Sequence, residues 1–213
     1  MAKDRTILIL GCLAAVLLLA TGGLWLSRGE ADAFAPCRKG LEASGLDGLG
    51  APFALTDQNG ARVTDRQVLA GPALLYFGYT YCPDVCPMDS ARNAEAVAIL
   101  DQRGMRLTPV FITVDPKRDT PEVLRDFTGA MHERMIGLTG SPAEIDAVAK
   151  AWRNYYRLND QEDSENYLVD HMTNSYLVMP GAGTVGVFDR ELSAPELAER
   201  AACFIDAASI AGI

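Results

Sequence analysis

The sequence predicts a three-layer α/β domain built around one mixed central sheet. Apolar segments typical of buried strands alternate with segments in which apolar residues recur at helical spacing. An Asn-Gly pair between two alternating segments predicts a hairpin at the start of the domain, and a second hairpin near its end supplies antiparallel strands. With 213 residues, of which 49% are hydrophobic, the chain can bury one substantial core. These observations favour a single α/β domain over two domains.

An uncharged apolar stretch precedes this domain. Residues 6–26, TILILGCLAAVLLLATGGLWL, have the length that crosses a bilayer as a helix. Lys3 and Arg5 precede the stretch, so the positive-inside rule keeps the N-terminus in the cytoplasm and sends the rest of the chain across the membrane. We expect an uncleaved anchor over residues 1–26, because the apolar region of a cleaved signal peptide is usually shorter.

A linker is expected between the anchor and the domain. Residues 27–49 are rich in Gly, Ala and Asp and show no sustained apolar period. Regular patterns begin only after them, so we expect the domain to span residues 50–213.

The elements of the domain follow from local patterns. Alternating residues around Asn59-Gly60 predict a hairpin, and apolar runs predict strands buried on both faces. Two helices are expected to start at Thr120 and Ser141, because each is an N-cap residue followed by proline. Strands are expected at residues 53–57, 61–64, 72–79, 107–115, 135–140, 174–179 and 184–189. Helices are expected at residues 90–104, 120–131, 141–156 and 193–208.

Cys82 and Cys86 stand four residues apart directly after a predicted buried strand, and each is followed by proline. The start of a helix lowers thiol pKa values, so both sulfurs should be available as thiolates. At helical spacing their Cβ atoms would lie about 5 to 6 Å apart, farther than the separation of about 3.8 Å in a disulfide. The spacing therefore favours a metal between the sulfurs. A disulfide stays open, because Pro83 and Pro87 can hold the loop out of regular helix.

A metal would need a third ligand, and the chain has only two histidines. His132 lies at the polar end of a predicted helix, where we expect a solvated side chain. His171 lies in a loop that leads into a buried strand, and we take it as the candidate ligand. Thiolates select Cu(I) or zinc, and an added imidazole also permits Cu(II). Structural zinc would want a fourth protein ligand, and none is evident. A three-ligand site with an open position is the arrangement that a metal carrier needs.

Four segments resemble the SCO/SenC family of copper proteins: YFGYTYCPDVCP, PVFITVDPKRDTPEVL, GLTGSPAEIDAVAKAWRNYY and YLVDH. The similarity covers about residues 50–205 in the family's order. It implies a thioredoxin-like fold on a membrane tether. For this chain we expect a single-pass protein of the bacterial cytoplasmic membrane, with its C-terminal domain in the periplasm.

The resemblance also implies a function. Cys82, Cys86 and His171 would bind copper as Cu(I) and Cu(II), and the chain would help to assemble the dinuclear copper site of cytochrome c oxidase subunit II. Other copper carriers are possible further partners. Tyr81 stands where many members have His, which removes a possible auxiliary ligand. Met172 stands where Ser or Thr is common, which places another soft sulfur near the site.

Three carboxylates lie near the expected ligands and could act on them indirectly: Asp84, Asp115 and Asp170. Asp84, between the cysteines, could orient their loop or cap the helix. Asp115 ends a predicted strand, where it could face the site or cap the following turn. Asp170 neighbours His171, but adjacent side chains of an extended chain point apart, so it is better explained as a loop anchor.

The other two exported cysteines, Cys37 and Cys203, could form a disulfide that pins the linker to an inner face of the last helix, or stay free. The formal charge is −9; Lys3, Asp4 and Arg5 sum to +1, which leaves −10 outside the membrane. Such an acidic domain argues against binding to nucleic acid or to anionic lipid.

Two alternatives to a copper chaperone remain. A thiol-disulfide oxidoreductase could use Cys82 and Cys86 alone, keeping the oxidase copper-site cysteines reduced. A copper or redox sensor would share the same motifs. Dithiol exchange should survive His171→Ala, whereas Cu(II) binding should not. The copper-chaperone hypothesis predicts a protein that does not catalyse a reaction with turnover.

Overall fold

The computed structural model describes residues 32–38, 46, 48–159 and 167–212. They form a seven-stranded sheet in the order β2-β1-β5-β4-β3-β8-β9. The central strands β3, β4 and β5 are parallel, and the remaining neighbours are antiparallel. The expected mixed sheet is confirmed. Its strands are β1 (Ala54–Asp57), β2 (Arg62–Thr64), β3 (Ala73–Gly78), β4 (Thr108–Thr113), β5 (Ile136–Thr139), β8 (Ser175–Met179) and β9 (Gly183–Phe188).

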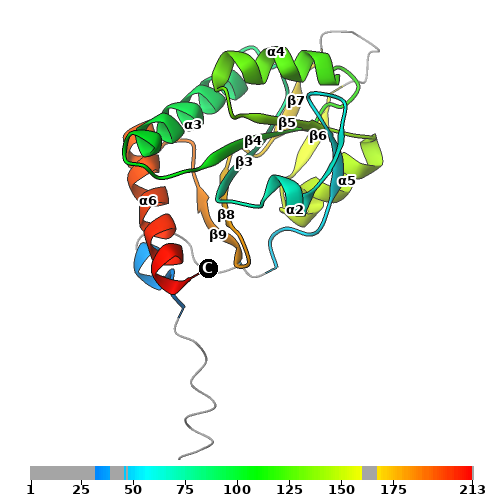
Figure 1. Ribbon diagram of the computed structural model, residues 1–213. Coiled ribbons are helices and arrows are strands. Elements are labelled where there is room, and N and C mark those ends of the chain that lie inside the picture. Colours follow the sequence, from blue (N-terminus) through cyan, green and yellow to red (C-terminus); the bar gives the residue numbers. More distant parts are fainter. Residues whose placement is uncertain (1–31, 39–45, 47, 160–166, 213) are drawn as a thin grey trace, which may run out of the picture. The chain divides into compact units, whose positions relative to one another are not determined.

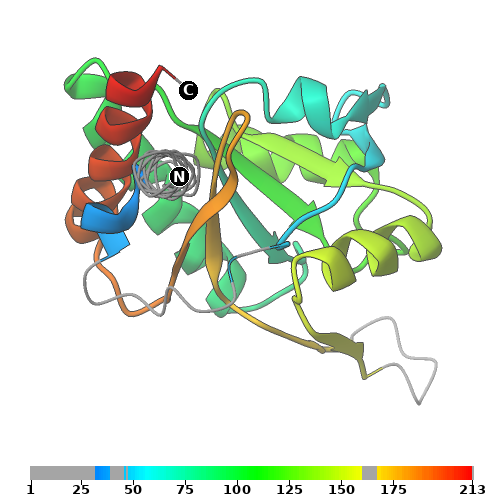
Figure 2. The ribbon, with the colours of Figure 1, turned by 90° about the horizontal axis from the view of Figure 1, so that it is seen from below.

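Helices cover both faces of this sheet (Figures 1 and 2). They are α2 (Asp65–Val68), α3 (Val85–Gln102), α4 (Pro121–Met131), α5 (Pro142–Ala151) and α6 (Ala194–Ala211). Leu74 of β3 packs in a core cluster with residues of α3 and α6, whereas the next residue, Leu75, packs in a cluster with residues of α5. Successive strand residues face opposite sides, so one strand supplies both cores. The three-layer arrangement is thereby confirmed.

The helix starts follow local capping chemistry. Thr120 and Ser141 accept hydrogen bonds from the backbone N–H groups of Val123 and Glu144, at 3.4 and 3.3 Å. Both predicted helix starts are confirmed. α3 begins five residues earlier than expected, because Pro87 falls in its first turn, where no backbone N–H is needed.

A second, two-stranded sheet was not expected. β6 (Tyr156–Leu158) pairs antiparallel with β7 (Val169–His171), and Tyr156 lies opposite His171. The prediction of a helix up to residue 156 was wrong, because α5 ends at Ala151 and Arg153 adopts a left-handed conformation with φ of 50°. This small hairpin brings His171 into the structure as the end of a strand rather than as part of a loop.

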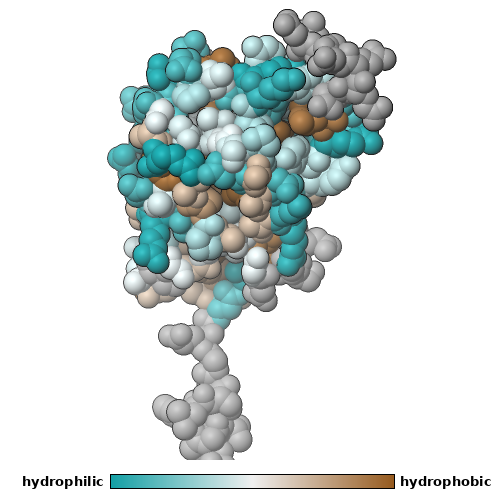
Figure 3. Space-filling view, turned by 90° about the vertical axis from the view of Figure 1, so that its right-hand side faces the viewer, coloured by the Kyte–Doolittle hydropathy of each residue, from teal (hydrophilic) through white to brown (hydrophobic). Residues whose placement is uncertain are grey.

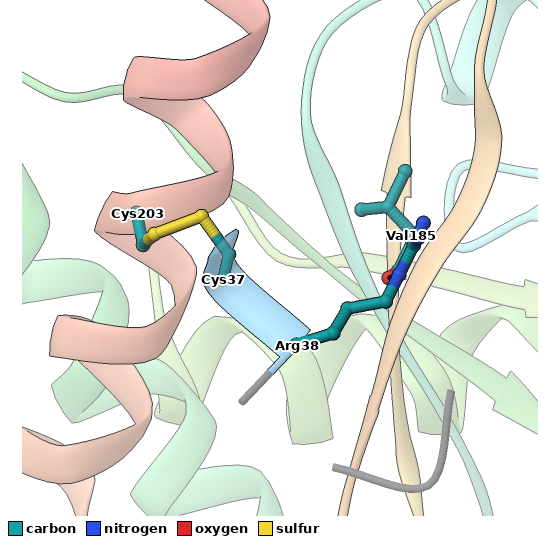
Figure 4. The surroundings of a disulfide bond; sticks show 4 residues. All are labelled: Cys37, Arg38, Val185 and Cys203. Carbon is teal, nitrogen blue, oxygen red and sulfur yellow. Dashed lines mark hydrogen bonds between the residues drawn. A yellow bond between two sulfur atoms is a disulfide. The ribbon is translucent and has the colours of Figure 1, made fainter. Parts of the chain in front are cut away.

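A disulfide joins Cys37 to Cys203 of α6, with a Cα separation of 5.7 Å. Cys37 lies in a short 3-10 helix, η1 (Ala35–Arg38), whose Arg38 donates a hydrogen bond to the Val185 carbonyl at 3.2 Å (Figure 4). Cys203 is exposed, so it does not lie on the inner face of the helix as expected. The compact unit begins at Phe34, and residues 34–38 of the expected linker therefore belong to it.

The expected anchor, residues 1–26, lies outside the described residues. Within residues 32–38, 46, 48–159 and 167–212, no helix has the length and apolar character needed to cross a bilayer. On the face of the molecule shown in Figure 3, hydrophilic and intermediate residues predominate and apolar ones form smaller areas.

Candidate metal centre

The cysteine pair lies where the central strand β3 leads into helix α3. Cys82 is half-buried in the connecting loop, and Cys86 is fully buried in the first turn of α3. Both are free thiols. The backbone N–H of Cys86 donates to the Cys82 sulfur, with a nitrogen-sulfur distance of 3.4 Å. Because Cys82 precedes the helix, regular helical spacing does not set the separation of the two sulfurs.

The two thiols have different electrostatic environments. Burial acts to raise the pKa of Cys82, but the backbone N–H groups of Cys86 and Asp84 donate to its sulfur and bring the pKa below its usual value. Burial raises the pKa of Cys86 far above its usual value. Cys82 is therefore the more easily ionised and more accessible sulfur.

The side chain of His171 contacts Cys86, although the two residues are far apart in the sequence. Its Nε2 lies 3.2 Å from the Cys86 sulfur, although 85 residues separate the two positions. Its Nδ1 lies 2.9 Å from the Met172 carbonyl oxygen, which can only accept a hydrogen bond. Nδ1 therefore carries the proton, and Nε2 presents its lone pair toward the cysteine. Burial lowers the pKa of His171, which favours this neutral form.

Aromatic residues enclose the imidazole. The rings of Tyr76 and Tyr79 meet the His171 ring edge-on, at centroid distances of 6.1 and 5.9 Å. Gly78 leaves room for the sulfur, since a Cβ atom at this position would lie 3.2 Å from the Cys86 sulfur and 2.8 Å from the Tyr76 ring. The site is thus shaped by the last residues of β3.

A buried polar pair behind Cys86 was missed in the sequence. The Tyr76 hydroxyl donates to Asp89 at 3.0 Å and also hydrogen-bonds Cys86. Asp89 is 3% exposed and lies 3.8–3.9 Å from the side chains of Arg92 and Arg190. A signal was present, because Asp89 follows Cys86 by three residues and so shares its helix face.

The three nearby carboxylates have distinct surroundings. Asp84 is exposed at the N-cap of α3, and its backbone, rather than its side chain, contacts Cys82. Asp115 is fully buried and accepts a hydrogen bond from the Tyr167 hydroxyl at 2.7 Å. Asp170 is exposed and pairs with Arg157 of the neighbouring strand β6 at 2.9 Å, as expected for an anchor of the hairpin.

The remaining candidates are peripheral. His132 is not solvated as expected: its Nδ1 accepts from the Arg134 backbone N–H at 3.1 Å, and its side chain is 12% exposed. Tyr81 and Met172 are exposed beside the site, at 52% and 40%. The structure thus brings His171 against Cys86, places Cys82 beside Cys86, and leaves His132 apart.

These three side chains offer two sulfurs and one imidazole nitrogen, which are ligands suited to copper. In the described part of the chain, no three His, Cys, Asp or Glu side chains are already arranged around a point that a metal ion could occupy. The Cys86-His171 contact is preformed, and the Cys82 sulfur already lies beside Cys86.

The fold and the site define a thioredoxin-like domain with a dithiol facing a histidine. Residues 42–206 match the family model described as SCO1/SenC. The chain belongs to the SCO1/SenC family. It is 47% identical to Protein SenC of Rhodobacter capsulatus over 99% of this chain and 91% of that protein. It is 38% identical to the mitochondrial Protein SCO1 homolog of Homo sapiens, over 70% of this chain and 50% of that protein.

Solved structures show the same fold. Arabidopsis thaliana ScoI with copper bound matches with a TM-score of 0.69 and 36% identity, over 76% of this chain and 99% of that chain. Bradyrhizobium japonicum ScoI with copper bound matches with a TM-score of 0.65 and 34% identity, over 74% of this chain and 98% of that chain.

Proposed function

We propose that the protein is a copper chaperone that binds Cu(I) and Cu(II) through Cys82, Cys86 and His171. The observation that carries the proposal is the 3.2 Å approach of the His171 Nε2 to the buried Cys86 sulfur, with the Nε2 lone pair directed toward it. Copper is the cargo of such a protein, and relatives of similar fold are known with copper bound.

The site suits a cargo that must leave again. Cys86 and His171 are held by the fold, whereas Cys82 lies in a loop and is partly accessible. A recipient's ligands can enter from the side of Cys82 and replace it before the buried ligands release the metal. The dinuclear copper site of cytochrome c oxidase subunit II is the recipient that we propose, with other copper carriers as possible donors.

The proposed location follows from the sequence. An anchor over residues 1–26 would hold the compact domain, which begins at Phe34, at the outer face of a bacterial cytoplasmic membrane. This arrangement would place the domain in the periplasm, beside a membrane-bound oxidase.

The test is a copper titration of the reduced full-length chain under argon. Cu(I) and Cu(II) are titrated into wild type, Cys82→Ser, Cys86→Ser and His171→Ala, with His132→Gln as the matched histidine control. One equivalent should bind to wild type and to the control. The cysteine variants should lose both ions, and His171→Ala should lose Cu(II) while keeping Cu(I), because two thiolates suffice for the softer ion. Equal Cu(II) binding by wild type and His171→Ala would contradict the proposal.

The asymmetry of the two thiols favours a second candidate, a thiol-disulfide oxidoreductase. Cys82 has a lowered pKa and is accessible, whereas Cys86 is buried and protonated. The Cys82 thiolate would attack a partner disulfide and form a mixed disulfide. Cys86 would then lose its proton, attack the Cys82 sulfur and release the partner as a dithiol, so that two electrons pass to the partner.

This second function has a separate test. Reduced wild type and His171→Ala should reduce a disulfide in a peptide from the oxidase copper site at similar rates, with loss in Cys82→Ser. No reduction by wild type, alongside copper binding as described above, would exclude this activity.

A further inference from the structure

A cluster of aromatic and charged side chains lies between the cysteine loop and the histidine strand. At its centre, the guanidinium of Arg118 lies 3.6 Å from the ring centroid of Tyr167 and 4.8 Å from that of Tyr81. Tyr79 is third, at 5.7 Å. A planar guanidinium stacks on tyrosine faces through cation-π attraction, which grows as the contact is desolvated. The Arg118 side chain is only 11% exposed and Tyr167 and Tyr79 are buried, so its contacts with these two rings are largely shielded from water.

Asp115 fixes this cluster to the central sheet. It lies just beyond β4 and is fully buried. One of its carboxylate oxygens accepts the Tyr167 hydroxyl hydrogen bond at 2.7 Å, and the other pairs with the Arg118 guanidinium. Tyr167 is therefore held through its ring by Arg118 and through its hydroxyl by Asp115, and both of these residues lie in the segment that follows β4.

The cluster connects the strand that carries His171 with the loop that carries Cys82. Tyr167 precedes β7, the strand that ends at His171. Tyr81 and Tyr79 flank the segment that leads into Cys82. The β6–β7 hairpin belongs to a separate sheet, so no ladder of main-sheet hydrogen bonds sets the position of His171.

Other contacts also tie the hairpin to the domain, besides those of His171 with Cys86, Tyr76 and Tyr79. The Asn154 side chain donates to the Met172 carbonyl at 3.3 Å, and the Val169 backbone hydrogen-bonds Tyr79. These contacts act on the hairpin at single points. Tyr79 also contacts both the histidine strand, at Val169, and the cysteine loop, at Cys82. Arg118 in turn contacts the rings of Tyr79, Tyr81 and Tyr167, so it connects the two segments through their aromatic side chains.

We propose that Arg118, Asp115 and Tyr167 form a clamp that positions His171 against Cys86, with Arg118 as its central positioning residue. The inference rests on the proposed function, in which His171 is a copper ligand. Opening the clamp frees the histidine strand, whereas Cys86 stays in helix α3 and Cys82 stays beside it through the hydrogen bond from the Cys86 backbone N–H. The clamp therefore controls Cu(II) binding, which needs the imidazole, and leaves Cu(I) binding to the thiolates.

Two conservative variants test the clamp. Arg118→Lys keeps the charge and loses the planar stacking surface, and Tyr167→Phe keeps the ring and loses the hydrogen bond to Asp115. Arg103→Lys, in a surface ion pair with Glu199, and Tyr155→Phe, an exposed tyrosine, are the matched controls. Cu(I) and Cu(II) affinities are measured by competition with chelators on the reduced full-length chain.

The Cu(II) affinity should fall about 10- to 100-fold in Arg118→Lys, the range found when a residue that orients a metal ligand is changed. The Cu(I) affinity should match wild type, and both controls should bind like wild type. A second readout needs no metal. The His171 ring protons lie against Tyr76 and Tyr79, so their NMR signals should move toward those of a free imidazole in Arg118→Lys and, to a smaller extent, in Tyr167→Phe.

The outcomes separate the clamp from the proposed function. If His171→Ala loses Cu(II) but both clamp variants bind Cu(II) like wild type, the clamp is overturned and the ligand set stands. Equal losses of Cu(I) and Cu(II) would show a general structural role and would also overturn it. If His171→Ala itself keeps Cu(II), the ligand set fails and the clamp fails with it. Should Arg118→Lys not fold, the milder Tyr167→Phe decides.

Discussion

The lack of a side chain at Gly78 provides room for the Cys86 sulfur. A Cβ at this position would lie 2.8 Å from the Tyr76 ring, 3.0 Å from Phe111 and 3.2 Å from the Cys86 sulfur. All three neighbours are buried, so none can move into solvent. Overpacking of this kind typically costs about 1–3 kcal/mol of stability.

We therefore expect Gly78→Ala to lower the free energy of unfolding by about 1–3 kcal/mol, and to weaken copper binding because Cys86 is displaced. Urea unfolding of the reduced protein measures the first effect and a copper titration the second. Gly71→Ala is the matched control, since nothing lies within 4 Å of a Cβ at Gly71. A Gly78→Ala protein as stable as the Gly71→Ala control would show that the pocket is looser than described.

At the residue scale, the candidate metal ligands could be predicted from the sequence, but the residues that surround them in the fold could not. Cys82 and Cys86 could be picked out by their spacing, and His171 because the chain has only two histidines. The role of Tyr76 could not be predicted, because its hydroxyl meets Asp89 only once β3 and α3 have packed. The same holds for Arg118, whose partners come from segments far apart in the chain.

Among the secondary-structure elements, helix α5 begins with a capping box whose Glu144 side chain has a lowered pKa. Glu144 accepts from the Ser141 backbone N–H at 2.7 Å and pairs with Arg62 at 2.7 Å. These contacts lower the pKa of Glu144 from 4.5 to about 2. Between pH 4.5 and 2, the Glu144 carboxylate takes up a proton more readily in the unfolded chain than in the folded chain. The stabilisation that ionised Glu144 gives the fold is therefore complete above about pH 4.5 and is lost as the pH falls toward 2.

Glu144→Gln should remove this pH dependence while keeping a capping-box residue. Wild type should lose stability more steeply than the variant between pH 4.5 and 2, and the difference should shrink in high salt, because the ion pair is exposed. Denaturant unfolding at a series of pH values measures this, with Glu95→Gln at an exposed position of α3 as control. Parallel pH profiles for wild type and Glu144→Gln would contradict the assignment.

Elements marked by local turn or capping chemistry could be predicted, and the short strands without such a mark could not. The Asn59-Gly60 hairpin and the N-caps Thr120 and Ser141 carry local chemistry that acts regardless of the tertiary fold. β6 and β7 have three residues each, too few to show a period. Arg153 carries no such signal, because its left-handed backbone is unusual for a residue other than glycine.

For the whole molecule, the disulfide between Cys37 and Cys203 closes a very long loop, with a sequence separation of 166 residues. Such a crosslink restricts the unfolded chain, and its removal typically costs about 2–5 kcal/mol. The sequence left this pairing open, because nothing local relates a residue before the first strand to one in the last helix.

The double variant Cys37→Ser, Cys203→Ser should lose about 2–5 kcal/mol of unfolding free energy, while copper stoichiometry remains unchanged because Cys82 and Cys86 are separate free thiols. Denaturant unfolding with and without a reductant measures the loss. The reductant should lower the stability of wild type to that of the variant. A copper stoichiometry that falls in the double variant would contradict the separation of the two cysteine pairs.

The most direct test of the central claim is X-ray absorption spectroscopy at the copper edge of the full-length chain loaded with one equivalent of Cu(II). The account predicts two sulfur scatterers at about 2.3 Å and an imidazole nitrogen at about 2.0 Å, by analogy with thiolate and imidazole ligands of zinc. The imidazole signature should vanish in His171→Ala and persist in His132→Gln. A spectrum without sulfur, or an imidazole signal that survives His171→Ala, would contradict the assignment of Cys82, Cys86 and His171 as the copper site.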